Sequence, residues 1–271
     1  MNYSPNNYVQ TERGAKLCEL IRSNLYLAIA IIMSVNLGLS ILNVLLIGQV
    51  ASAVTGLILP VLTLVGVWML RSAATRGFRT SPFGFLKVRT ISLMVVFIIG
   101  IVSLLILMAF SGTIVDVIKA AENGGEVVIG GAGGQSIKLD AETRESILKA
   151  LDTLNSYYPD ATQSIHEYGQ TIIIIVAAAA IAVCALALVG AIKANGVINK
   201  MKNTIVFGFD EPIKTGYLTA ILYVFAGLML IYTVASLFTG LFSVWQIGNL
   251  LEIALMVLAA MFYGKVSEIM R

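Results

Sequence analysis

One acidic side chain, Glu252, stands alone in a long uncharged stretch near the end of the sequence. It is the only Asp, Glu, Lys or Arg between Tyr217 and Gly264. An ionisable group inside a membrane segment is costly to place there and often binds a proton or a cation. Two interpretations without a functional role stay open. The carboxyl group could reach water, or it could stay protonated against a neighbouring hydroxyl. Glu252 is therefore a candidate intramembrane polar site.

Three polar residues in an earlier apolar stretch, Asn36, Ser40 and Asn43, fall at i, i+4 and i+7, which places them on one face of a helix. In lipid, such side chains are expected to turn inward and to hydrogen-bond across helices. Helix packing is the default interpretation, and the sharper alternative is a polar path lined by these residues and gated by Glu252. All three residues join the candidate intramembrane site.

The inventory of catalytic residues is poor. His166 is the only histidine, and the two cysteines, Cys18 and Cys184, do not form a disulfide framework or a metal-ligand pattern. The run from Gly130 to Gly134 lacks the Gly-Lys-Ser/Thr of a phosphate-binding loop, and no Gly-x-Ser-x-Gly motif occurs. The sequence therefore predicts a protein that is not an enzyme and that holds no metal or cofactor.

The composition indicates where these residues are placed. The 271 residues are 58% hydrophobic and 12% charged, with a mean hydropathy of +0.89, whereas an average soluble domain is about 25% charged. These figures exclude a disordered chain and argue strongly against a soluble globular domain. The net charge of +3 is too small for a nucleic-acid binder that relies on charge. The chain is therefore predicted to be an all-α polytopic membrane protein.

Uncharged stretches divide into six predicted transmembrane helices, each near the roughly 20 residues that cross a bilayer. Two of the stretches are long enough for two helices, with breaks at Gly48-Gln49 and near Phe242-Ser243. Ala51-Ser52-Ala53 has the form of a signal-peptide cleavage site, but the apolar run before it is too long for a signal peptide. The predicted helices cover residues 25–47, 50–70, 91–110, 171–192, 217–240 and 244–264.

Basic residues gather on one side of this arrangement. Fourteen of the 18 Lys and Arg residues lie in the N-terminal segment 1–24, in the loops between predicted helices 2 and 3 and between 4 and 5, or in the tail 265–271. The other four lie beside nine acids in segment 111–170. Because Lys and Arg mark the cytoplasmic side, we expect a plasma-membrane protein with both termini cytoplasmic. The spans then fall in residues 25–110 and 171–264, and segment 111–170 is extracytoplasmic.

The extracytoplasmic segment is predicted to be a small α+β insertion between helices 3 and 4. Glu126–Ile129 and Ser136–Leu139 have the composition of two short strands around a glycine-rich turn. Asp140 can cap a helix over Ala141–Tyr157, whose apolar residues recur at helical spacing. A segment of this size buries little core by itself, so we expect it to lean on the membrane helices or on another subunit.

The chain resembles itself at an offset of 124 residues. Leu62–Gly66 aligns there with Leu186–Gly190, and Thr80–Phe85 aligns with Thr204–Phe209. One interpretation is a parallel duplication that relates helix hairpin 2–3 to hairpin 4–5, and the alternative is chance matching of abundant residues. Under the duplication, both Phe-Gly-Phe elements lie on the cytoplasmic side, near where helices 3 and 5 begin.

Aromatic and basic residues around these elements form a candidate cytoplasmic face. Aromatic rings favour the headgroup level of a bilayer, and bases beside a membrane attract anionic lipid with about 1 kcal/mol per charge. The simpler interpretation is that these residues anchor the protein at the membrane interface. The more specific interpretation is that they dock a protein partner. The face comprises Arg76, Arg79, Phe83, Phe85, Lys87, Arg89, Phe207 and Phe209.

Two functional hypotheses follow from these patterns. The leading one is a non-catalytic membrane subunit or scaffold, whose partners are membrane lipid and a protein partner or a second copy of the chain, and not nucleic acid. The alternative is a small permease or channel, with a path lined by Asn36, Ser40, Asn43 and Glu252. A dry bundle in which Glu252 faces away from the three polar residues would count against the alternative.

Overall fold

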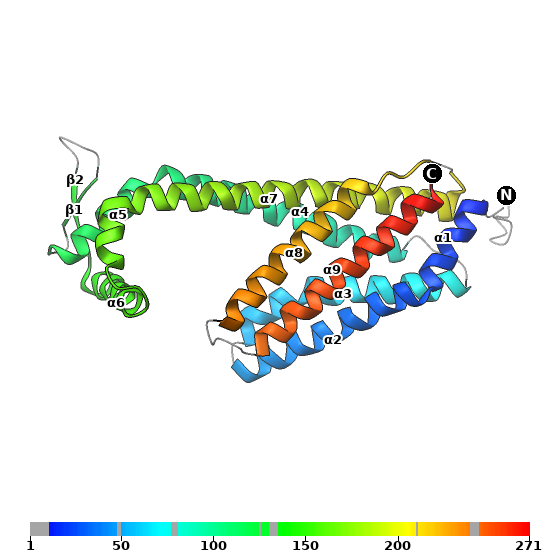
Figure 1. Ribbon diagram of the computed structural model, residues 1–271, viewed down its shortest axis with the longest axis horizontal. Coiled ribbons are helices and arrows are strands. Elements are labelled where there is room, and N and C mark those ends of the chain that lie inside the picture. Colours follow the sequence, from blue (N-terminus) through cyan, green and yellow to red (C-terminus); the bar gives the residue numbers. More distant parts are fainter. Residues whose placement is uncertain are drawn as a thin grey trace. The chain divides into compact units, whose positions relative to one another are not determined.

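The computed structural model describes residues 11–47, 50–76, 81–124, 126–129, 135–209, 211–238 and 244–271 (Figure 1). The helices are α1 (Glu12–Arg22), α2 (Asn24–Ile47), α3 (Val50–Arg76), α4 (Ser81–Ala109), α5 (Ser111–Glu122), α6 (Ala141–Tyr157), α7 (Ala161–Phe207), α8 (Gly216–Phe238) and α9 (Val244–Ile269). The strands are β1 (Glu126–Ile129) and β2 (Gln135–Lys138). The predicted breaks at Gly48-Gln49 and Phe242-Ser243, and the glycine run, lie outside the described residues.

The prediction of a multi-pass membrane protein with six spans is confirmed. Within the described residues, six helices are long and apolar enough to cross a membrane, namely α2, α3, α4, α7, α8 and α9. Their bounds follow the uncharged stretches closely at α2 and α8. Helix α4 begins earlier than predicted, at Ser81, and Pro82 occupies a position near the helix start that suits proline. Lys87 and Arg89 therefore lie on a helix and not in a loop.

The chain divides into two compact units, each described by itself. The first comprises Met1–Val95 with Leu186–Arg271, and the second comprises Val96–Ala185. In the first unit, α8 packs against α9, and α2 packs against both α9 and α3. The two ends of the described chain meet at one end of this unit, where Arg13 Nη2 donates to the carbonyl of Arg271 at 3.3 Å. This arrangement agrees with an even number of crossings.

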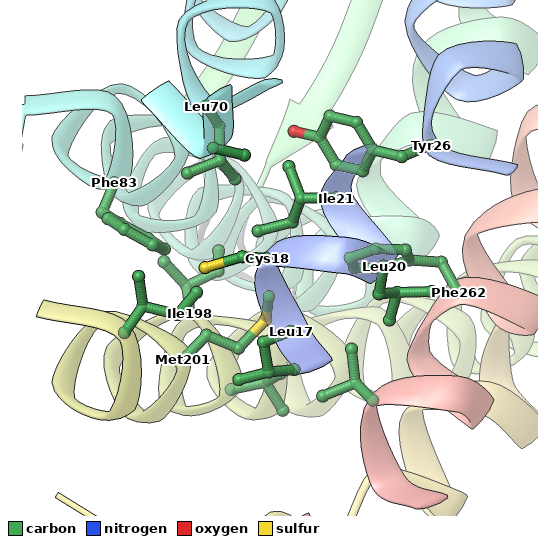
Figure 2. Close-up of a cluster of buried hydrophobic side chains, with 14 of the residues drawn as sticks. Leu17, Cys18, Leu20, Ile21, Tyr26, Leu70, Phe83, Ile198, Met201 and Phe262 are labelled. Carbon is green, nitrogen blue, oxygen red and sulfur yellow. The ribbon is translucent and has the colours of Figure 1, made fainter. Parts of the chain in front are cut away.

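The core of the first unit lies at that same end. Buried side chains from α1, α2, α3, α4, α7, α8 and α9 gather there, a cluster that we call the end core (Figure 2). Its most buried large members include Leu17 and Ile21 on α1, Leu70 on α3 and Phe83 on α4, and Met201 on α7 joins them. The end core thus holds together helices that are distant in sequence.

Helix α1 falls in the segment 1–24, for which the sequence analysis predicted no helix. Thr11 caps it, because its side chain accepts from the amide of Gly14 at 3.2 Å. Lys16 lies 2.6 Å from Glu12, one turn away, and lowers the pKa of that carboxyl below its ordinary value. Leu17, Cys18 and Ile21 recur at helical spacing and are buried. This spacing was the signal in the sequence that would have predicted α1.

Helix α7 is much longer than the predicted span. Its 47 residues rise about 70 Å at 1.5 Å each, whereas the hydrocarbon core of a bilayer is about 30 Å thick. The part predicted as a loop after residue 192 is helical as far as Phe207. Val197, Met201 and Thr204 are buried along one side of this extension, and the charged residues between them made it look like a loop.

The prediction of a separate α+β insertion is not supported. Besides β1 and β2, which pair antiparallel with Glu126 opposite Lys138 and Ile129 opposite Gln135, the described part of segment 111–170 is helical. Helix α7 begins inside the segment, at Ala161, and runs on into the span. The compact unit accordingly reaches from Val96 to Ala185. Few side chains are buried here, Leu151 on α6 among them.

The predicted duplication fails at its second match. Phe83–Phe85 lies in the first turns of α4, whereas the aligned Phe207 ends α7 and Phe209 lies beyond the helix. The two Phe-Gly-Phe elements therefore occupy opposite kinds of helix end, which does not fit a duplicated hairpin. Phe209 nevertheless precedes the start of α8, at Gly216, by seven residues. The first match is structurally consistent, because Gly66 packs on Phe85 of α4 and Gly190 packs on Ile221 of α8.

Candidate functional site

Glu252 lies on α9, and its side chain is exposed on the surface of the fold. Helix α2, which carries the three predicted polar partners, packs against α9. Asn36 faces α9 one turn before the glutamate, because a Cβ built on Gly248 would lie 4.0 Å from Asn36 Oδ1. The structure therefore brings Asn36 to the neighbourhood of Glu252, and it gives no hydrogen bond between the two among the described residues.

Ser40 behaves differently from the prediction. Its hydroxyl donates to the carbonyl of Asn36 at 2.9 Å, within α2, and so its proton is used by its own helix. A hydroxyl in a membrane helix commonly satisfies itself in this way when no neighbouring helix offers an acceptor. Asn43 is half-buried. Of the three predicted polar residues, Asn36 is the one that the structure places against α9 at a measured distance.

Arg89 adds a basic group to this region. It lies on α4, half-buried, within electrostatic range of both Tyr263 and Glu252 on α9. Arg89 was predicted to belong to the candidate cytoplasmic face that binds lipid or a partner, and no role was predicted for Tyr263. Eleven positions, about three helical turns, separate Glu252 from Tyr263. The two residues thus share a face of α9, and this spacing was the signal that would have linked them.

The described residues of the predicted cytoplasmic face do not all lie at the surface. Phe83 is only 1% exposed and lies in the end core beside Cys18 and Ile198, so its assignment to an exposed face is wrong (Figure 2). Phe85 is half-buried because it packs on Gly66, whose hydrogen leaves room for the ring-bearing carbon. Burial of apolar rings against α1 and α3 outweighs any gain from placing them in the interface.

The predicted basic residues of this face lie in different parts of the chain's structure. Lys87 is half-buried on α4, and its carbonyl accepts from the hydroxyl of Thr90 at 2.9 Å. Arg76 is the last residue of α3, and Arg79 lies outside the described residues. Of the first Phe-Gly-Phe element, the structure buries Phe83 and half-buries Phe85.

The second Phe-Gly-Phe element does form an exposed surface. Phe207 is 49% exposed and Phe209 is 59% exposed, with their ring centroids 6.2 Å apart in a tilted arrangement. The ammonium of Lys202 lies 5.4 Å from the centroid of the Phe207 ring, within the range of a cation–π interaction. We call Lys202, Phe207, Gly208 and Phe209 the α7 cap.

Backbone and side-chain hydrogen bonds hold the α7 cap in place. Gly208 has a φ of +70°, which glycine adopts without the strain that a side chain would bring. The amide of Phe209 then donates to the carbonyl of Asn203 at 3.2 Å, and the hydroxyl of Thr204 donates to the carbonyl of Phe209 at 2.8 Å. The two rings are therefore exposed by a defined helix ending.

The segment that follows the cap is tied to α7 and to α9. Lys200 donates from Nζ to the carbonyl of Pro212 at 3.0 Å and lies 3.7 Å from Glu211 Oε2. Thr215 donates to the carbonyl of Tyr263 at 2.7 Å. These contacts fix the segment that leads to α8. They pair the ammonium of Lys200 with Glu211, and they do not involve Lys202.

Comparisons with known proteins do not assign this chain to a family: no family model, no curated protein and no solved structure matches it. Within the described residues, no group of three or more His, Cys, Asp and Glu side chains could hold a metal ion. The intramembrane polar residues and the α7 cap are therefore the features of the fold that indicate a function.

Proposed function

We propose that this protein is a non-catalytic subunit or scaffold of the plasma membrane, with both termini in the cytoplasm and segment 111–170 outside. The end of the first unit that carries the end core and the α7 cap binds membrane lipid and a protein partner or a second copy of the chain. Nucleic acid is not a partner. The basic residues in the terminal segments, and Lys193, Lys200 and Lys202 in the C-terminal part of α7, support this orientation.

The α7 cap is the observation that carries the proposal. Phe83 and Phe262 are packed into the end core, whereas Phe207 and Phe209 are held outward by a specific helix ending. Exposed apolar groups of this kind mark contact with a membrane or with another protein.

A photo-crosslinking side chain placed at Phe209 tests the proposal in the full-length protein, kept in its native membrane. We expect Phe209 to give adducts with lipid or with a reproducible protein neighbour, identified by mass spectrometry. Glu19 is exposed on α1 near the same end and serves as the control position. Equal adduct yields at Phe209 and Glu19, or none at Phe209, would overturn the proposal.

A second candidate function, a small permease or channel, is favoured by one observation. Asn36 of α2 faces α9 one turn from Glu252, so an amide group and a carboxyl group from two packed spans lie near each other. Reconstitution into vesicles that contain a pH-sensitive dye separates the two functions. A proton leak that disappears in Glu252→Gln supports the permease, whereas a leak equal to that of empty vesicles supports the scaffold.

A further inference from the structure

The α7 cap combines three features that together select one kind of neighbour. Its two aromatic rings are exposed, a cation sits on one of them, and the hydrogen bonds of the helix ending fix their arrangement. An aromatic ring offers a large apolar area with little conformational freedom to lose, so a pre-positioned pair binds at a low entropic cost. The geometry is that of a prepared contact surface.

The chain itself places this surface beside the membrane. Helix α8, a membrane span, begins at Gly216, seven residues after Phe209. The intervening segment is pinned to α9 by the bond from Thr215 to Tyr263 and by a second bond from Ser267 to the carbonyl of Ile213 at 3.4 Å. Because α9 is also a span, these bonds hold the cap near the level at which two spans leave the bilayer. Aromatic residues concentrate at that level in membrane proteins.

The charge at the cap matches a lipid headgroup. Lys200 is engaged by Glu211 and by the carbonyl of Pro212, whereas Lys202 makes no ion pair with any described residue and has its ammonium over the Phe207 ring. An ammonium held on a ring at the headgroup level can donate hydrogen bonds to a lipid phosphate on its outward side. In a zwitterionic lipid the choline or amine already neutralises the phosphate, so a cation without an ion-pair partner among the described residues favours anionic lipid.

We propose that the α7 cap is a binding site for the headgroup of an anionic lipid in the surrounding bilayer. Lys202 pairs with the phosphate, and Phe207 and Phe209 pack against the glycerol and the upper acyl chains. The inference rests on the proposed function and deepens it, because it names the chemical class of lipid that one surface of the scaffold selects. A protein neighbour at the cap is the outcome that would replace it.

Native mass spectrometry of the full-length protein tests the assignment. The protein is mixed in detergent with equal amounts of phosphatidylglycerol and phosphatidylcholine, and the spectrometer measures which lipid stays bound when the detergent is removed. The wild-type protein is expected to retain phosphatidylglycerol in preference. A single charge near an anionic surface is worth about fivefold in binding, so Lys202→Gln is expected to reduce that preference by about this factor. Lys202→Arg keeps the charge and the ring contact and is expected to retain the preference.

Lys193 provides the matched control, because it is an exposed lysine on the same helix. Lys193→Gln is expected to leave the preference unchanged, and Phe209→Ser is expected to weaken retention of both lipids alike. The headgroup assignment would be overturned if Lys202→Gln and Lys193→Gln reduced the preference for phosphatidylglycerol equally, or if Lys202→Gln did not reduce it. Crosslinking at Phe209 separates this failure from failure of the scaffold itself, because adducts there uphold the scaffold even when the lipid preference does not depend on Lys202.

Discussion

Arg22 and Arg71 each cap the helix that carries the other. The guanidinium of Arg22, in the last turn of α1, donates from Nε to the carbonyl of Ala74 in the last turn of α3 at 2.5 Å, and its Nη2 donates to the same oxygen. Arg71 of α3 returns the contact from Nη1 to the carbonyls of Ile21 at 3.2 Å and Ser23 at 3.0 Å. The final carbonyls of a helix lack partners within it, and cations are favoured at that end.

We expect this reciprocal contact to hold α1 against the bundle. Arg71→Ala removes two hydrogen bonds from a charged donor and should reduce the free energy of unfolding by about 1.5–3 kcal/mol, whereas Arg22→Ala should cost less because that residue is exposed. Arg71→Lys keeps the charge but lacks the planar fork and should recover only part of the loss. The measurement is amide hydrogen exchange of α1 in detergent, and unchanged exchange in Arg71→Ala would contradict the role.

The packing of α1 is expected to depend on its buried face and not on its helix propensity. Leu17 is fully buried in the end core, so Leu17→Ala should lower the free energy of unfolding by about 2–5 kcal/mol. Glu19→Ala, an exposed change on the same helix, should alter it by no more than about 0.5 kcal/mol. Thermal unfolding in detergent measures both, and similar losses in the two variants would show that α1 does not need the end core.

The membrane architecture was predictable from the sequence because the bilayer imposes a simple requirement. A span needs about 20 apolar residues with every backbone group bonded inside the helix, and uncharged stretches of this length were plain. Helix α6 was predicted to the residue for a local reason: Asp140 accepts from the amide of Thr143, so the cap itself marks where the helix begins.

Helix α1 and the extension of α7 were not predicted, because tertiary contact makes them helical. Lys200 and Lys202 interrupt the apolar pattern of α7, and only burial of Val197 and Met201 against α1 reveals the period of the helix. The candidate site was limited in the same way. Two identical Phe-Gly-Phe tripeptides have opposite exposure, since Phe83 begins a helix that packs into the end core and Phe209 follows a helix that ends at the surface.

Gly66 permits the close approach of α3 and α4, and its replacement should be costly. A Cβ at this position would lie 2.8 Å from Cβ of Phe85 and 3.5 Å from the amide of Leu86. Since a backbone would have to move, Gly66→Ala should lower the free energy of unfolding by about 1–3 kcal/mol. Gly84→Ala is the control: its Cβ would meet nothing within 4 Å, and the better helix propensity of alanine should stabilise by about 0.4–1 kcal/mol. Effects of the same sign in thermal unfolding would contradict this packing.

Helix α6 should weaken under acidic conditions, because its cap is a carboxylate. Hydrogen bonds from the amide and the hydroxyl of Thr143 lower the pKa of Asp140 below its ordinary value. A carboxyl whose pKa is depressed by folding stabilises the folded state above its ordinary pKa of 3.8, and this contribution is lost as the pH falls through the depressed value.

The measurement for this prediction is the protection of α6 amides from hydrogen exchange, corrected for intrinsic rates, between pH 6 and pH 2. Asp140→Asn keeps an oxygen that can cap the helix but does not titrate, so its protection should vary less with pH than that of the wild type. Asp140→Ala should lower the protection across the whole range. The same pH dependence in wild type and Asp140→Asn would refute the assignment.

Glu122 and His166 should contribute to stability as a coupled pair in the second unit. Glu122 Oε2 and His166 Nε2 lie 2.5 Å apart, and both atoms are buried without a separate hydrogen-bond partner among the described residues. Glu122→Leu or His166→Leu should each cost about 1–3 kcal/mol, because an apolar side chain offers no hydrogen bond and leaves the remaining atom buried without its one counterpart. The double variant should cost less than the sum, with a coupling above about 0.5 kcal/mol in a double-mutant cycle. Glu145→Gln, an exposed change on α6, should show no coupling to His166, and strictly additive effects at Glu122 and His166 would mean that their contact does not stabilise the fold.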